Sequence, residues 1–131
     1  MKTIVFLITI LVLVSSGCTS SKEYVSRGDE KYKNRDYAGA VVEYTNAIEA
    51  DPKCVAAYTN RAGIKKKLND NKGAIADYCK LIELQPKEGV WYYERGRLFI
   101  DQGEQKDGCL DLTKAGELGV DVSETIKILC R

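Results

Sequence analysis

The sequence contains no histidine. Ser-His-Asp and Cys-His nucleophiles are therefore excluded, and so is every zinc site with a histidine ligand. The five cysteines include no pair at C-x-x-C spacing, which disfavours a metal site built from cysteines alone. We expect no cofactor and no metal, and among catalytic mechanisms only carboxylate or lysine chemistry stays open.

Neither sign of charge is in excess. The chain has 20 Lys and Arg against 19 Asp and Glu, a net charge of +1. Nucleic-acid binding calls for a basic stripe, so we expect no nucleic-acid partner. Hydrophobic residues make up 44% and charged residues 30% of the chain, which is typical of a folded protein rather than a disordered one.

Long hydrophobic runs are also lacking. The apolar stretch from Ile4 to Val14 is shorter than the roughly 20 residues that span a bilayer. Lys2 precedes it and small residues follow it, as in a secretory signal peptide. We predict a signal peptide over residues 1–17; a poor transmembrane anchor is the alternative.

Ser16, Gly17 and Cys18 resemble the lipobox of bacterial lipoproteins, although Ser15 stands where leucine is usual. The resemblance implies a lipid on Cys18, which would become the mature N-terminus. Several acyl chains would anchor the protein stably. We expect a protein lipid-anchored to the bacterial cell membrane or outer membrane, with its folded part facing the periplasm. Residues 18–22 would form the lipidated N-terminus and a short linker.

A pattern of a tyrosine, an arginine three residues later and a tiny residue next to it returns at a constant period. It begins at Tyr24, Tyr58 and Tyr92, and the only two prolines, Pro52 and Pro86, are separated by the same period. Apolar residues at three- and four-residue spacing predict two amphipathic helices in each period. The units span about residues 21–54, 55–88 and 89–120.

These units resemble the tetratricopeptide repeat (TPR), a helix-turn-helix of the same period. The resemblance covers about residues 21–118 and implies an all-α fold, in which residues 23–120 form three units stacked as a right-handed superhelix. It pairs small residues across each hairpin and puts an aromatic residue in the second helix. The small pairs are Gly28 with Ala40, Ala62 with Ala74, and Gly96 with Gly108; Tyr44 and Tyr78 fit the aromatic position, and Leu112 replaces it in the last unit. Lys31 and Lys65 depart from the repeat's apolar pattern, which predicts looser packing there.

An acid follows each repeated arginine by sixteen residues. In a helical hairpin of this size the two positions face each other, so we predict an ion pair inside every unit. The predicted pairs are Arg27 with Glu43, Arg61 with Asp77, and Arg95 with Asp111. The alternative is solvated charges that coincide in spacing.

The sequence predicts a C-terminal capping segment over residues 121–131, in which residues 122–130 form the helix. Asp121 and Glu124 have the spacing of a capping box, and Val122, Ile126 and Leu129 form an apolar stripe. A helix docked this way could bring Cys130 within bonding distance of Cys109, and we leave the disulfide open. Cys54 and Cys79 are expected to lie too far apart to bridge.

In TPR proteins the first helices of the units line a concave groove that takes a peptide or a partner helix. The resemblance implies that partner contacts here come from Asp29, Tyr32, Asn60, Lys66, Lys67, Tyr93 and Arg97. The tyrosines would be aromatic anchors and the cations would contact anions. Only Asn60 agrees with the family's clamp for a C-terminal carboxylate, so we do not expect chaperone-tail binding. A solvated face without a ligand is the alternative.

The leading hypothesis is a membrane-anchored protein–protein interaction scaffold of the bacterial cell envelope, without catalysis. An accessory subunit of an envelope enzyme or of a transport or assembly complex is a second hypothesis. A third is an enzyme that uses the carboxylates of Asp101, Glu104 and Asp107. We disfavour it because these are typical turn and helix-start residues.

Overall fold

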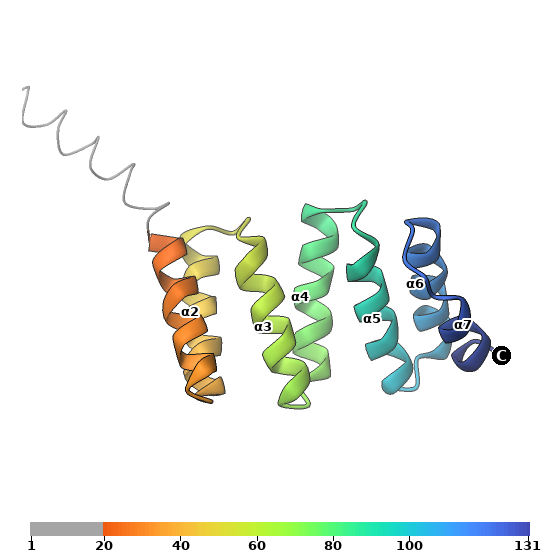
Figure 1. Cartoon of the computed structure of the whole chain (residues 1–131), viewed down its shortest axis with the longest axis horizontal. Coiled ribbons are helices and arrows are strands. Elements are labelled where there is room, and N and C mark those ends of the chain that lie inside the picture. Colours follow the sequence, from red (N-terminus) through yellow and green to blue (C-terminus); the bar gives the residue numbers. More distant parts are fainter. Residues whose placement is uncertain (1–19) are drawn as a thin grey trace, which may run out of the picture. The chain divides into compact units, whose positions relative to one another are not determined.

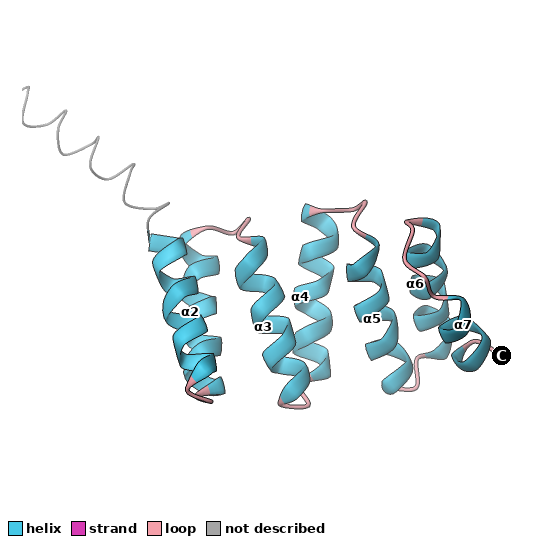
Figure 2. Ribbon diagram, in the orientation of Figure 1, coloured by secondary structure: helices cyan, strands magenta, loops and turns pink. Residues whose placement is uncertain are grey.

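The computed structural model describes residues 20–131, which form helices and no strands (Figures 1 and 2). The described part of the first helix spans residues 20–33. After it come α2 (Tyr37–Ala50), α3 (Val55–Lys67), α4 (Asn71–Leu84), α5 (Gly89–Asp101), α6 (Gln105–Glu117) and α7 (Ser123–Leu129). The all-α prediction is confirmed; the stacking of all three units as one superhelix stays a prediction.

The chain divides into two compact units. The N-terminal unit ends at Ala57, and the C-terminal unit spans Tyr58–Arg131. The predicted signal peptide and Cys18 lie outside the described residues. Among the helices of residues 20–131, none combines the length and the apolar character needed to cross a membrane.

Helix boundaries follow local chemistry. Asp36 and Asp70 are the N-caps of α2 and α4, and each accepts a hydrogen bond of 2.9 Å from a backbone N–H three residues later. The N–H of Gly39 and the Lys31 ammonium hold the pKa of the Asp36 carboxyl below its usual range. Both helices end two residues before a proline, Pro52 or Pro86, as predicted.

The turn inside each hairpin uses a left-handed residue. Arg35, Asn69 and Gly103 have φ angles of 61°, 62° and 84°, and each follows the previous one by a single repeat period. The next residue in each hairpin donates its N–H to a carbonyl five residues earlier, which closes the helix end. Only Gly103 adopts this conformation without a steric cost to a side chain.

In the N-terminal unit the first helix packs closely on α2. A Cβ on Gly28 would lie 2.6 Å from the Tyr44 ring, so this position needs glycine. Tyr32, farther along the first helix, is 44% exposed.

The linker predicted over residues 18–22 is wrong where the structure describes it. Residues 20–22 are helical. Ser21 is buried, and its hydroxyl donates to the Ala47 carbonyl oxygen at 3.0 Å. Since residues 19–22 contain neither glycine nor proline, nothing in the sequence stops the helix from starting early.

The C-terminal unit has its core between its helices. Ala62, Ala74, Leu81 and Leu112 are fully buried. In the third hairpin the backbones of α5 and α6 approach so closely that a Cβ on Gly96 would lie 2.9 Å from the Gly108 carbonyl oxygen. The small-residue pairs of the sequence therefore lie where the helices meet.

The helix α7 closes the C-terminal unit but differs in detail from its prediction. Val122 is buried and packs against Gly116. The capping box does not form, because Asp121 accepts hydrogen bonds from Ser123 while Glu124 pairs with Lys127 at 2.7 Å. A disulfide joins Cys109 of α6 to Cys130, with the two Cα atoms 5.7 Å apart.

Candidate functional site

The second hairpin contains the predicted ion pair between Arg61 and Asp77. The guanidinium donates two hydrogen bonds, of 3.0 and 2.6 Å, to the two carboxylate oxygens of Asp77. The Asp77 side chain is only 3% exposed. Lys65 adds a second cation, with its ammonium 3.1 Å from Asp77. The looser packing predicted at Lys65 is therefore wrong, because the lysine completes a buried ionic cluster.

The third hairpin repeats this arrangement with Arg95 and Asp111. Two hydrogen bonds of 2.7 and 2.9 Å join the guanidinium to the carboxylate. These bonds raise the pKa of Arg95 further above its usual value. The remaining guanidinium nitrogen donates to the Cys79 sulfur at 3.2 Å. The paired, half-buried groups stabilise the hairpin.

The pair predicted between Arg27 and Glu43 is wrong. Arg27 instead pairs with Glu23 at 2.5 Å on the exposed surface of the first helix. The Oε2 atom of Glu43 is buried and has no hydrogen-bond partner in the part of the chain that the structure describes. Glu23 lies four residues before Arg27, the favoured spacing for a helical ion pair. The equivalent positions of the other hairpins hold Ala57 and Trp91, which cannot compete.

Each repeated arginine also lies over the ring of the tyrosine three residues earlier. The guanidinium carbon is 5.5 to 5.8 Å from the ring centroid in all three hairpins. The sequence analysis missed these cation–π contacts, although the three-residue spacing on a helix face was a usable signal. They explain why the tyrosine and the arginine recur together.

Five of the residues predicted to contact a partner lie on α3 and α5 in the C-terminal unit. We define the α3–α5 face by its members Asn60, Lys66, Lys67, Tyr93, Glu94 and Arg97. The ammonium of Lys66 pairs with the Glu94 carboxylate and so connects the two helices. Glu94 offsets the charge of Lys66 within this face, and the anion contact expected of Lys66 stays a prediction.

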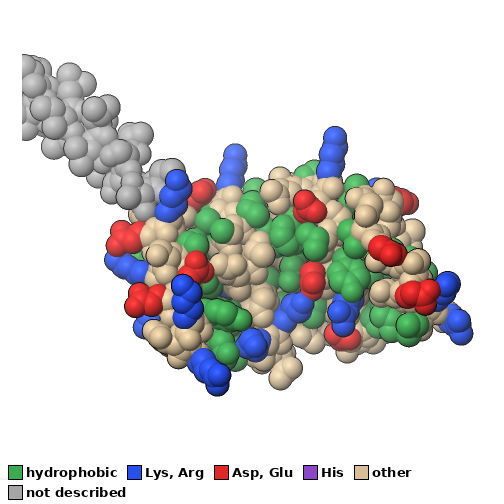
Figure 3. Space-filling view, viewed as in Figure 1, with side chains coloured by type: hydrophobic (Ala, Val, Ile, Leu, Met, Phe, Trp, Pro, Cys, Tyr) green, Lys and Arg blue, Asp and Glu red, His purple; other side chains and the backbone are tan. Residues whose placement is uncertain are grey.

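Aromatic rings support the α3–α5 face. The Arg97 guanidinium lies 5.9 Å from the Tyr93 ring centroid, and the Lys66 ammonium lies 6.0 Å from that of Tyr78. Burial, reinforced by the negative charges of Glu94 and Asp77, raises the pKa of the Tyr78 hydroxyl. Figure 3 shows hydrophobic side chains between acidic and basic ones over α4 and α5.

Two predicted contact residues belong to the N-terminal unit. Asp29 accepts a hydrogen bond of 2.6 Å from the Tyr44 hydroxyl, so its carboxylate has a structural role. Tyr32 is exposed and lies beside Tyr37, with 5.6 Å between the ring centroids. Tyr32 thus offers an aromatic surface to solvent.

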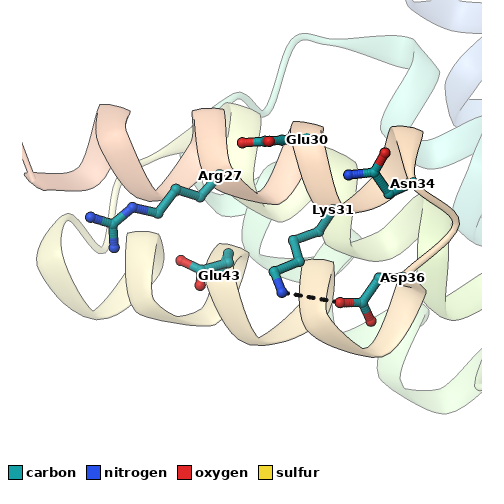
Figure 4. A pocket seen from close by; sticks show the side chains of 6 residues that line it. All are labelled: Arg27, Glu30, Lys31, Asn34, Asp36 and Glu43. Carbon is teal, nitrogen blue, oxygen red and sulfur yellow. Dashed lines mark ion pairs between the residues drawn. The ribbon is translucent and has the colours of Figure 1, made fainter.

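A polar cleft of about 280 Å³ lies between the first helix and α2 (Figure 4). We call it the Glu43 cleft; its lining residues are Arg27, Glu30, Lys31, Asn34, Asp36 and Glu43. The Lys31 ammonium lies 3.2 Å from the Asp36 carboxylate. In Figure 4 no ion pair joins the Arg27 guanidinium to Glu43. Sequence reasoning did not find this cleft, because it predicted that Arg27 would fill it.

The residues of the enzymatic hypothesis are all on the surface. Asp101, Glu104 and Asp107 are exposed at the turn between α5 and α6. None of them is in the cleft described above. Cys54 and Cys79 are free thiols. The arrangement gives no support to a catalytic role for the three carboxylates.

The repeat and the fold also emerge from comparison with known proteins. Residues 55–88 match the family model of the tetratricopeptide repeat, the span predicted for the second unit. A search of curated protein sequences finds no match.

Several solved structures resemble the chain. The TPR2B domain of yeast Sti1 in its complex with pHsp70 is 27% identical, with a TM-score of 0.71 over 85% of this chain and 93% of that chain. The Arabidopsis OM64 TPR domain is 23% identical, with a TM-score of 0.74 over 86% and 94%. The first TPR of Spaghetti (RPAP3), bound to the HSP90 peptide SRMEEVD, is 22% identical, with a TM-score of 0.73 over 86% and 89%. The fold of this chain is therefore that of TPR domains.

Proposed function

We propose that this chain is a lipid-anchored interaction module of the bacterial cell envelope, which binds a segment of a partner protein on the α3–α5 face and performs no catalysis. The observation that carries the proposal is the composition of that face. Tyr93 and Arg97 are side chains of the kind that dominate binding energies. The ion pair between Lys66 and Glu94 holds the two helices in register beneath the partner.

The similar structures support a protein or peptide partner. Two of them, the Sti1 domain and the first Spaghetti domain, are complexes with chaperone sequences. In this chain the α3–α5 face carries charges of both signs, because Glu94 offsets Lys66. A partner segment with mixed charge and an apolar residue opposite Tyr93 fits this face better than an acidic tail does.

The membrane anchor is part of the proposal through Cys18. The described helix begins at residue 20, two residues after Cys18. Two residues span at most about 7 Å, so a lipid on Cys18 would hold the N-terminal unit close to the membrane surface. The partner would then itself lie at or near that surface.

Site-specific photo-crosslinking tests the binding face. We expect a photoreactive residue in place of Tyr93 to crosslink a defined envelope protein in intact cells. The same residue in place of Lys80, which is exposed on α4, is the matched control and should not. Arg97→Ala should reduce the crosslink at position 93. Equal crosslinking from positions 93 and 80 would contradict the proposed face.

Membrane fractionation tests the anchor separately. Cys18→Ser should move the full-length chain from the membrane fraction to the soluble fraction, because no acyl chain can be attached to serine through a thioether. Cys54→Ser is the control, since Cys54 is a free thiol outside the lipobox. Retention of the Cys18→Ser protein in the membrane fraction would refute the lipid anchor without affecting the proposed binding face.

A further inference from the structure

The acid that follows the repeated arginine by sixteen residues has a different environment in the first hairpin. Asp77 is held by Arg61 and Lys65, and Asp111 is held by Arg95. In the first hairpin Arg27 and Lys31 correspond to Arg61 and Lys65, but each pairs with an acid other than Glu43. Glu43 therefore keeps a buried carboxylate oxygen without a hydrogen bond among the described residues.

Surface acids draw these two cations away. Arg27 pairs with Glu23, and Lys31 pairs with Asp36. Each of these pairs is neutral. The Glu43 cleft is also lined by Glu30 and Glu43. Among its charged lining residues, these two alone form no ion pair within the described residues. The cleft is thus net negative and attracts a cation.

The geometry favours an organic cation over a metal ion. In residues 20–131 no group of three or more acidic or cysteine residues is arranged to hold a metal. The other two hairpins show which cation suits this position, because a guanidinium makes two parallel hydrogen bonds to the acid there. A planar guanidinium matches a carboxylate in this bidentate manner, whereas an ammonium is a point charge.

We propose that the Glu43 cleft binds an arginine side chain of a partner protein. Its guanidinium takes the place beside Glu43 that Arg61 and Arg95 take beside their own acids. The Asn34 side chain also lines the cleft. The site lies wholly within the N-terminal unit, and it is distinct from the α3–α5 face and independent of it.

Titration with a minimal ligand tests the proposal. The full-length chain in detergent micelles is titrated with N-acetyl-arginine amide, and backbone amide shifts around residue 43 are followed by NMR. We expect saturable shifts confined to the lining residues. N-acetyl-citrulline amide, which has a similar shape without the charge, should produce none. Unsaturable shifts, or equal shifts with citrulline, would overturn the proposal.

Four variants separate a specific site from general attraction of a cation. Glu43→Gln should weaken binding by about tenfold or more, since a hydrogen bond to a buried charge is lost. Arg27→Gln should tighten binding because it removes a positive charge from the lining of the cleft. Glu23→Gln should weaken binding, because the released Arg27 can turn to Glu43. Glu49→Gln, an exposed change on α2 outside the cleft, should leave affinity unchanged.

The pattern of the four variants decides the outcome. Thermal unfolding of each variant checks that the fold is intact, and the Arg27→Gln result does not depend on Glu43→Gln folding. Affinity in Glu43→Gln equal to that of the unaltered chain would overturn the proposal. Equal weakening by Glu23→Gln and Glu49→Gln would show long-range attraction only and would also overturn it.

Discussion

Asp77 and Glu43 occupy the same position of their repeats, yet only Asp77 is held by the repeated arginine. The difference comes from one neighbour, because Glu23 competes for Arg27 and the second hairpin has Ala57 in its place. The arginine–acid spacing therefore predicted the ion pair correctly in the second and third hairpins but not in the first. A repeat pattern predicts which residues can meet, and local competitors decide whether they do.

Double-mutant cycles measure this difference. For Arg61→Ala with Asp77→Ala we expect a coupling free energy of about 1–3 kcal/mol, because the pair is half-buried and bidentate. For Arg27→Ala with Glu43→Ala we expect about zero. Urea denaturation of the unaltered chain and of the two single variants and the double variant in each cycle supplies the values. Similar coupling in both cycles would show that Arg27 reaches Glu43 in solution.

Arg35 is a second residue that differs from its counterpart in another repeat. It has a φ angle of 61° where Gly103 serves in the third hairpin. A left-handed conformation is costly for a side chain other than glycine, so Arg35→Gly should raise the free energy of unfolding by about 0.5–1 kcal/mol. Thermal unfolding checks this result. Gly103→Ala is the converse control and should lower stability by a similar amount.

The helices of a hairpin pack closely against each other. The contact of α5 with α6 depends on Gly96, where a Cβ would lie 2.9 Å from the Cβ of Asp111. We expect Gly96→Ala to lower the free energy of unfolding by about 1–3 kcal/mol, because the backbones must separate. Gly63→Ala is the matched control. A Cβ there meets nothing within 4 Å, so alanine should stabilise α3 by up to about 1 kcal/mol.

The last element, α7, is short and has no fully buried residue of its own. Its attachment to α6 therefore relies on the Cys109–Cys130 disulfide and on the buried Val122 just before the helix. A bridge across 21 positions of sequence restricts the unfolded chain by about 3 kcal/mol in the loop-entropy account.

We expect Cys109→Ser/Cys130→Ser to lower the free energy of unfolding by up to about 3 kcal/mol under oxidising conditions. The expected loss should vanish in reductant, where the unaltered chain should behave like the variant. Chemical denaturation with and without reductant measures both. Equal stability of the two proteins under oxidising conditions would show that the disulfide does not stabilise the C-terminal unit.

At the scale of the whole molecule, charge balance limits the ligands that fit. The chain has a net charge of +1, and Glu94 neutralises Lys66 on the α3–α5 face. The peptide SRMEEVD, which is bound to the first Spaghetti domain, carries three acidic side chains and a C-terminal carboxylate.

We therefore expect SRMEEVD to bind the full-length chain with a dissociation constant weaker than about 1 mM. Fluorescence anisotropy of the labelled peptide measures this. Glu94→Gln should improve binding because it releases the Lys66 ammonium, while Glu117→Gln on α6 is a control for the loss of a negative charge elsewhere. Micromolar binding by the unaltered chain would contradict the charge argument.

The sequence by itself determined the periodic features of this protein. Helix positions, helix ends and the small residues between helices all recur with the repeat period, because each depends on local spacing and on side-chain size. The match of residues 55–88 to the TPR family model has the boundaries that periodicity predicts for the second unit. The acids sixteen residues after Arg61 and Arg95 were likewise found from spacing alone.

Only the tertiary structure decided which of several possible partners each charged group takes. Arg27 had two acids within reach, Lys66 had a distant partner on another helix in Glu94, and Lys65 joined a buried cluster where looser packing was predicted. These choices depend on burial and on competing neighbours in three dimensions, which spacing along the chain does not encode. For the same reason the Glu43 cleft became visible only after the first hairpin was folded.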